Sequence, residues 1–127
     1  MKNNGLKFKI ILAIFVVILI FAFLFLNSRG TGKYSDEALN AFAQCLAAKN
    51  VTMYGAYWCS HCQNQKAMFG SSFKHVPYVE CTTEPQKCLA AKVEGYPTWV
   101  LADGTQLAGE RPLETLAAAS GCALPQQ

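Results

Sequence analysis

Two cysteines separated by two residues lie in the segment Trp58-Cys59-Ser60-His61-Cys62, directly after the apolar run 51–57. This spacing allows the two thiols to open and close a disulfide. The run is rich in strand-forming residues, and the pair falls where a strand is expected to give way to a helix. A sulfur at a helix N-terminus is stabilised as a thiolate by unpaired N–H groups and the helix dipole. His61 adds a positive charge beside it when protonated, so the pattern favours thiol–disulfide exchange.

Three other interpretations of this segment stay open. The pair could form a static structural disulfide, or the domain could be a binding module without redox activity. Cys59, His61 and Cys62 could also bind zinc or copper(I), because soft sulfur ligands suit both metals. That arrangement would crowd three ligands into one helical turn and supplies no obvious fourth, so we expect no metal.

The N-terminal part of the chain predicts a membrane anchor. Residues 10–26 are an unbroken apolar run of 17 residues, long enough to cross a bilayer with modest help from its flanks. The lysines that precede it place residues 1–9 in the cytoplasm as a basic tail. Residues 27–34 then read as a flexible tether, and 35–127 as a folded domain outside the cytoplasm. A cleaved signal peptide is the competing interpretation, but the run is long for one and no Ala-x-Ala site follows it.

The net charge of +3 belongs to the membrane flanks and not to the domain. Residues 1–33 carry five basic side chains and no acidic ones, whereas residues 34–127 carry six basic and eight acidic side chains. A nucleic-acid-binding domain would need a basic face of its own. We therefore expect no nucleic-acid partner.

The hydrophobic spacing and the turn residues after the tether predict an α/β domain. Asp103-Gly104 is a strong hairpin signal, so the last two strands should be antiparallel neighbours. Alternating helices and strands before that turn favour parallel crossovers. The sequence therefore predicts a central four-stranded mixed sheet with helices on both faces, preceded by one transmembrane helix. The expected helices are 36–50, 59–69, 84–93 and 112–121, and the expected strands are 51–57, 77–81, 98–102 and 105–108.

These motifs together resemble the thioredoxin superfamily, over nearly all of residues 36–122. The resemblance rests on a strand followed by the Cys59–Cys62 pair, and on Gly95-Tyr96-Pro97-Thr98 before a hairpin. Residues 53–66 look most like the thioredoxin-like domain fused to vitamin K epoxide reductase homologues.

The resemblance implies roles for individual residues. Cys59 would be the more exposed nucleophile and Cys62 the resolving cysteine, with Ser60 and His61 between them. A cis proline is expected at Pro97, opposite the dithiol, where the neighbouring backbone of Tyr96 and Thr98 would pair with a substrate peptide. Trp58 would either shield the dithiol or pack in the core. The redox-active disulfide would take the place of a separate cofactor.

The resemblance also implies partners. The domain would oxidise cysteines of exported proteins on the extracytoplasmic (periplasmic) side, and a quinone-linked membrane oxidase similar to vitamin K epoxide reductase would recharge it. A disulfide reductase or isomerase supplied by a membrane electron carrier is the alternative, because the same exchange runs in both directions.

One position departs from the family pattern. Many members keep a buried carboxylate six residues before the first active cysteine, as a proton acceptor for the second, and Met53 stands there in this chain. Glu80, on the neighbouring strand, is the nearest candidate to replace it. Water is the other.

The four remaining cysteines, Cys45, Cys81, Cys88 and Cys122, allow three pairings. Cys81 and Cys88 are close in the sequence, so we favour Cys81–Cys88 together with Cys45–Cys122. An even number of cysteines in a small exported domain is typical of structural disulfides in an oxidising compartment. An alternative is that Cys81–Cys88 relays electrons between the Cys59–Cys62 pair and a membrane enzyme.

Overall fold

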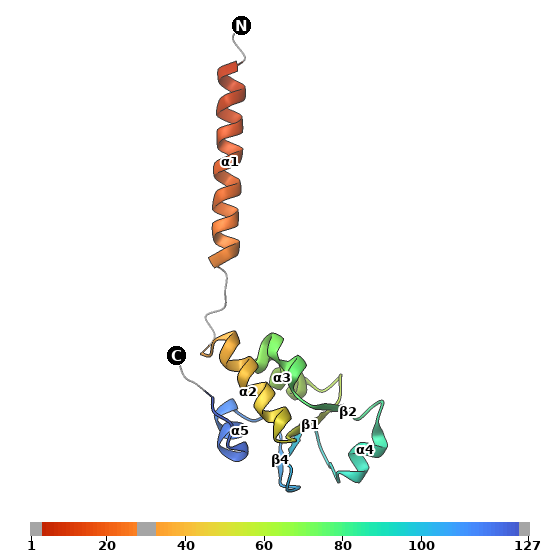
Figure 1. The fold of residues 1–127 in the computed structure, drawn as a ribbon. Helices are drawn as coiled ribbons and strands as arrows, with labels where there is room; N and C mark the ends of the chain where they lie inside the picture. The colour runs from red at the N-terminus through yellow and green to blue at the C-terminus, as the bar shows by residue number, and fades with distance from the viewer. Residues whose placement is uncertain (1–3, 28–32, 125–127) are drawn as a thin grey trace. The chain divides into compact units, whose positions relative to one another are not determined.

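The N-terminal apolar run forms one continuous helix, α1 (Asn4–Asn27), in the computed structural model (Figure 1). The structure describes residues 4–27 and 33–124. The 24 residues of α1, at about 1.5 Å each, extend roughly 36 Å, which exceeds the roughly 30 Å of a bilayer's hydrocarbon core. The segment Gly5–Phe25 is long and apolar enough to cross a membrane, and none of it is buried in the protein. The helix begins well before the predicted anchor at residue 10, so Lys7 and Lys9 are helical.

The rest of the described chain forms a separate compact unit built on a four-stranded sheet with the order β2-β1-β3-β4. β1 (Thr52–Gly55) and β2 (Tyr78–Glu80) are parallel. β1 is antiparallel to β3 (Thr98–Val100), and β3 to β4 (Gln106–Ala108). The predicted four-stranded mixed sheet and its closing hairpin are therefore confirmed.

Helices connect and flank these strands (Figure 1). The helix α3 (Ser60–Phe69) follows β1 and precedes β2 along the chain, as the crossover connection between two parallel strands requires. A short 3₁₀ helix, η1 (Gly70–His75), follows α3 in a stretch where no helix was expected. The α-helices of this unit are α2 (Asp36–Ala48), α3 (Ser60–Phe69), α4 (Pro85–Ala90) and α5 (Leu113–Ser120).

Most elements are shorter than predicted, and local backbone geometry explains where they stop. The helix predicted over 84–93 ends as α4 at Ala90, because Lys92 adopts a left-handed conformation with φ of 55°. Asn50 takes the same left-handed conformation two residues after the end of α2, so the helix predicted over 36–50 also stops early. The strand predicted over 51–57 ends at Gly55, where Ala56 accepts from the N–H of Cys59 in a tight turn.

The start of the domain is held by side chains of residues predicted to belong to the tether. Tyr34 donates a 2.6 Å hydrogen bond to Glu114 on α5, and Lys33 forms an ion pair with the same carboxylate. Ser35 accepts from the N–H of Ala38 and caps α2. Asn27 ends α1, and residues 28–32 of the predicted tether lie outside the described residues.

The core lies between α2, α3, α5 and the central strands. Phe42 of α2 stacks on Phe69 of α3, with ring centroids 5.9 Å apart, and Phe69 in turn packs on Trp99 of β3. All three side chains are fully buried. This aromatic cluster fixes the position of α3, which carries the cysteine pair, against the sheet.

Two disulfides join the four cysteines outside the Cys59–Cys62 pair. Cys45 on α2 is bonded to Cys122 after α5, and Cys81 after β2 is bonded to Cys88 on α4. This is the pairing that the sequence favoured. The sequence separations are 77 and 7 residues, so the first bond closes almost the whole domain and the second closes a single loop.

We predict that the two disulfides contribute unequally to stability. In the chain-entropy model, replacing Cys45 and Cys122 together by serine lowers the free energy of unfolding by about 4 kcal/mol, and replacing Cys81 and Cys88 lowers it by about 2 kcal/mol. Urea unfolding of the full chain in detergent, followed by the fluorescence of buried Trp99, measures both changes. Equal losses, or a larger loss for the Cys81–Cys88 pair, would contradict the prediction.

Candidate active site

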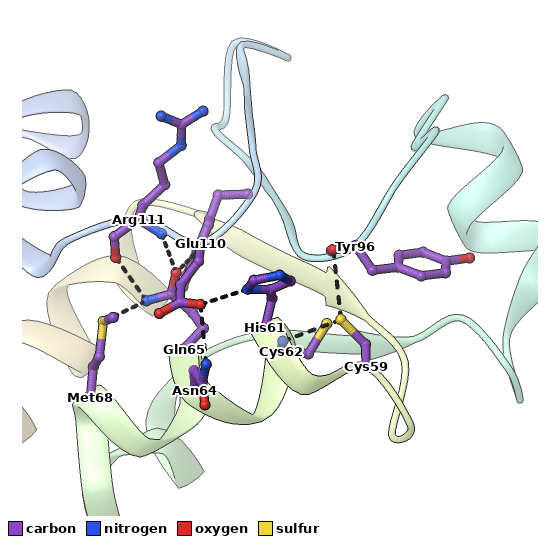
Figure 2. Close-up of polar contacts among 10 residues, drawn as sticks. Cys59, His61, Cys62, Asn64, Gln65, Met68, Tyr96, Glu110 and Arg111 are labelled. Carbon is purple, nitrogen blue, oxygen red and sulfur yellow. Dashed lines mark hydrogen bonds and ion pairs between the residues drawn. The ribbon is translucent and has the colours of Figure 1, made fainter.

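The two unpaired cysteines lie at the start of α3 (Figure 2). Cys59 is the N-cap of the helix, and its Sγ accepts a 3.2 Å hydrogen bond from the backbone N–H of Cys62. The sulfur of Cys59 thus faces the N-terminal end of the helix dipole, where negative charge is favoured. The sequence placed the helix start within one residue of its observed position.

The two cysteines differ in access to solvent. Cys59 is 8% exposed and Cys62 is completely buried. Burial, together with the hydrogen bond to Cys59, raises the pKa of Cys62 to about 12. Cys62 therefore keeps its proton until a neighbouring group or a reaction removes it, whereas Cys59 is the sulfur that a second protein can reach.

The loop before β3 lies against Cys59. The peptide bond between Tyr96 and Pro97 is cis, as the resemblance implied, and the thiol of Cys59 points at the carbonyl oxygen of Tyr96 over 3.6 Å. The hydroxyl of Thr98 donates to the carbonyl of Gly95, and the carbonyl of Pro97 accepts from the N–H of Gly109. These two hydrogen bonds fix the backbone on either side of the cis peptide bond.

Aromatic side chains surround the exposed edge of the pair. Trp58 packs edge-on against Tyr96, with ring centroids 6.2 Å apart. Trp58 and Tyr57 are both more than 60% exposed, so Trp58 does not belong to the core. Ser60, the first residue of α3, is also exposed.

His61 lies beside the cysteine pair, and one of its ring nitrogens faces Glu110 (Figure 2). Its Nδ1 lies 3.0 Å from a carboxylate oxygen of Glu110, which also accepts from Asn64 at 3.5 Å. Glu110 lies 49 residues from His61 along the chain, and sequence reasoning did not connect the two. The carboxylate beside the cysteine pair therefore comes from the loop between β4 and α5, and not from α3.

Gln65 anchors α3 from the inside. Its side-chain oxygen accepts from the indole N–H of Trp99 and from the N–H of Arg111, and its amide donates to the carbonyl of Arg111. The side chain is fully buried. Sequence reasoning missed it, although Cys62, Gln65 and Phe69 recur at helical spacing on one face of α3, which was the available signal.

A second polar pair lies on β2, behind Cys62. The hydroxyl of Tyr78 donates a 2.6 Å hydrogen bond to Glu80, which also accepts from Thr82 and from the N–H of Tyr57. Burial opposes the charged form of Glu80, but the donors from Thr82 and Tyr78 outweigh it, and its pKa lies below the usual value. Sequence reasoning identified Glu80 as a candidate and missed Tyr78.

The described residues contain no group of three or more His, Cys, Asp or Glu side chains arranged to hold a metal ion. Cys59 and Cys62 are near each other, but His61 Nδ1 is occupied by Glu110. The arrangement instead suits a dithiol that closes into a disulfide, since one sulfur is accessible, activated by the helix and adjacent to the other.

Comparison with known proteins agrees with the fold and the site. Residues 33–120 match the family model described as thioredoxin. The chain is also similar to the thiol-disulfide oxidoreductase LTO1 of Arabidopsis thaliana, with 42% identity over 95 residues that cover 68% of this chain. The match spans 25% of that relative's length, so it concerns one part of a longer protein. Given the matched family model, the four-stranded sheet and the dithiol facing a cis proline, the chain belongs to the thioredoxin family.

Proposed function

We propose that this protein is a thiol–disulfide oxidoreductase that uses Cys59 and Cys62. The observation that carries the proposal is the contrast among the six cysteines: four are paired in disulfides, and the remaining two lie together at a helix N-terminus, with Cys59 8% exposed and Cys62 fully buried. The name of the Arabidopsis relative supports the same activity.

In the oxidising direction, the reaction begins with a disulfide between Cys59 and Cys62. A substrate thiolate attacks Cys59 Sγ, a mixed disulfide forms, and Cys62 leaves and takes up a proton. The second substrate thiolate then attacks the substrate sulfur, which forms the substrate disulfide and releases Cys59. Two electrons pass from the substrate to the protein. The backbone of Tyr96, whose carbonyl oxygen lies 3.6 Å from Cys59 Sγ, is proposed to pair with an extended substrate segment.

This proposal predicts opposite results for the two single cysteine variants. Cys62→Ser should accumulate a mixed disulfide when it is mixed with a disulfide formed between two single-cysteine peptides. The Cys59 thiolate attacks that disulfide and one peptide thiolate leaves, and no Cys62 remains to displace the second peptide. Cys59→Ser should accumulate none, since the remaining sulfur is buried. Non-reducing electrophoresis with mass spectrometry of the full chain in detergent measures both.

The double variant Cys81→Ser/Cys88→Ser is the matched control, because it removes two sulfurs and leaves the dithiol in place. Its exchange should match the unmodified protein. A loss of exchange in this double variant, if it folds, would favour a relay through Cys81 and Cys88. A mixed disulfide formed by Cys59→Ser would contradict the assignment of Cys59 as the nucleophile.

His61 is proposed to stabilise the thiolate of Cys59 while its own charge is shared with Glu110. His61→Ala should then make the pair less oxidising, with a reduction potential lower by about 15–30 mV, because a stabilised thiolate favours the reduced form. Equilibration with glutathione measures it. Asn64→Ala is the control, because Asn64 contacts the same carboxylate without charge, and an equal shift in both variants would refute the electrostatic role.

The favoured direction is oxidation of cysteines in exported proteins, with a quinone-linked membrane oxidase as the recharging partner. The resemblance of residues 53–66 to domains fused to vitamin K epoxide reductase homologues supports this choice. A reductase or isomerase supplied by a membrane electron carrier is the second candidate. Reoxidation of the reduced protein by membranes that contain quinone, and not by quinone-depleted membranes, would separate the two.

Helix α1 is proposed to anchor the protein as a single span, with the catalytic domain on the extracytoplasmic side. Its apolar segment and the lysines before it support this orientation. In inside-out vesicles the domain should resist added protease, and in right-side-out cells stripped of their wall or outer membrane it should be digested. The reverse pattern would overturn the orientation.

A further inference from the structure

The burial of Cys62 requires a route for its proton. Each catalytic cycle moves a proton to or from Cys62 Sγ, and that atom has no contact with solvent. The backbone N–H of Ala56 and the Lys66 ammonium favour its thiolate, but neither can accept a proton from it. Met53, at the position where the family often has a carboxylate, is buried and apolar. A polar group that can both accept and donate a proton must therefore come from elsewhere.

The structure places the Tyr78 hydroxyl beside Cys62. Gly55 lies between them on β1, and a β-carbon there would lie 3.0 Å from Cys62 Sγ and 3.3 Å from the Tyr78 oxygen. The sulfur and the hydroxyl thus share the space that a side chain at position 55 would occupy. Glycine at this position keeps that space open to both groups.

The Tyr78 hydroxyl is connected onward to Glu80. Its proton is donated to Glu80 over 2.6 Å, and the carboxylate also contacts Thr82 and the N–H of Tyr57, where the chain leaves β1. Glu80 is partly exposed, so a proton that reaches it can pass to water. Lys66 lies 3.7 Å from the centre of the Tyr78 ring and favours negative charge along this route.

We propose that Tyr78 and Glu80 carry the proton of Cys62 between its buried sulfur and solvent. The inference rests on the proposed function. When Cys62 resolves a mixed disulfide on Cys59, its S–H bond breaks, the Cys59–Cys62 bond forms and the partner sulfur leaves as a thiolate. The hydroxyl of Tyr78 accepts the proton of Cys62 while its own passes to Glu80. Oxidation of a substrate runs the same transfer in reverse, so electrons and protons balance in both directions.

The test follows the reactions of Cys59 and Cys62 as two successive steps. The reduced full chain in detergent is mixed with dithiobis(nitrobenzoate), a coloured aromatic disulfide. Attack by Cys59 releases the first equivalent of coloured thiolate, and attack by Cys62 on the mixed disulfide releases the second. The proposal expects Tyr78→Phe to slow the second release by about tenfold to a hundredfold and to leave the first unchanged, as loss of a general base would. Glu80→Gln should slow the second release as well.

The pH profile separates proton transfer from a structural role. In both variants the defect should shrink as the pH rises, because a larger fraction of Cys62 is then already a thiolate and needs no base. A defect that is the same at every pH would overturn the proposal, as would an unchanged second release. If Tyr78→Phe does not fold, Glu80→Gln decides the result by the same criteria.

Matched variants control for the chemical change itself. Tyr54→Phe removes a phenol hydroxyl from β1 on the face opposite Gly55, and Glu94→Gln neutralises an exposed carboxylate in the loop before the cis proline. Both should release the two equivalents at normal rates, and a slowed second release in either would contradict the assignment to Tyr78 and Glu80. Loss of the first release in the unmodified protein would instead refute the proposed function and not the proton route alone.

Discussion

The chemistry of this protein depends on where helix α3 begins. Because Cys59 is the N-cap, its sulfur accepts a backbone hydrogen bond from Cys62 N–H that a thiolate would strengthen. One helical turn then carries Cys62 into the interior, where its pKa is raised to about 12 by burial and by the hydrogen bond to Cys59. A start one residue earlier or later would take Cys59 out of the N-cap position and turn Cys62 by about 100° around the helix axis, away from the interior. The asymmetry between nucleophile and resolving cysteine is thus a consequence of helix register.

Several contacts from distant parts of the chain fix that register. Phe69 is held between Phe42 and Trp99 at one end of α3, and Gln65 joins the middle of the helix to Trp99 and to the backbone of Arg111. Glu110, the residue before Arg111, contacts His61 Nδ1 through its carboxylate. Gly109, one residue earlier, bonds the carbonyl of Pro97. A short segment between β4 and α5 therefore positions both the helix and the loop that faces Cys59.

The features predicted correctly from the sequence are those encoded locally. The CxxC spacing after an apolar strand located the site, and Asp103-Gly104 located the hairpin. Strand lengths were overestimated because apolar runs extend past the last ladder hydrogen bond, as at Ala56. The partners of His61 and Gln65 were missed because they lie 49 and 46 residues away, and no local pattern marks such pairs. Tyr78 was missed because an aromatic residue in a strand is usually interpreted as core.

The reduction potential of the Cys59–Cys62 pair tests the account most directly. The full chain in detergent is equilibrated with glutathione mixtures, and the fraction of the pair in the disulfide form is counted by mass spectrometry after alkylation. We expect a reversible two-electron couple at an oxidising potential, roughly −120 to −180 mV. A value near that of thioredoxin, about −270 mV, would contradict the oxidising direction. A pair that never forms a disulfide across the glutathione range would contradict thiol–disulfide exchange itself.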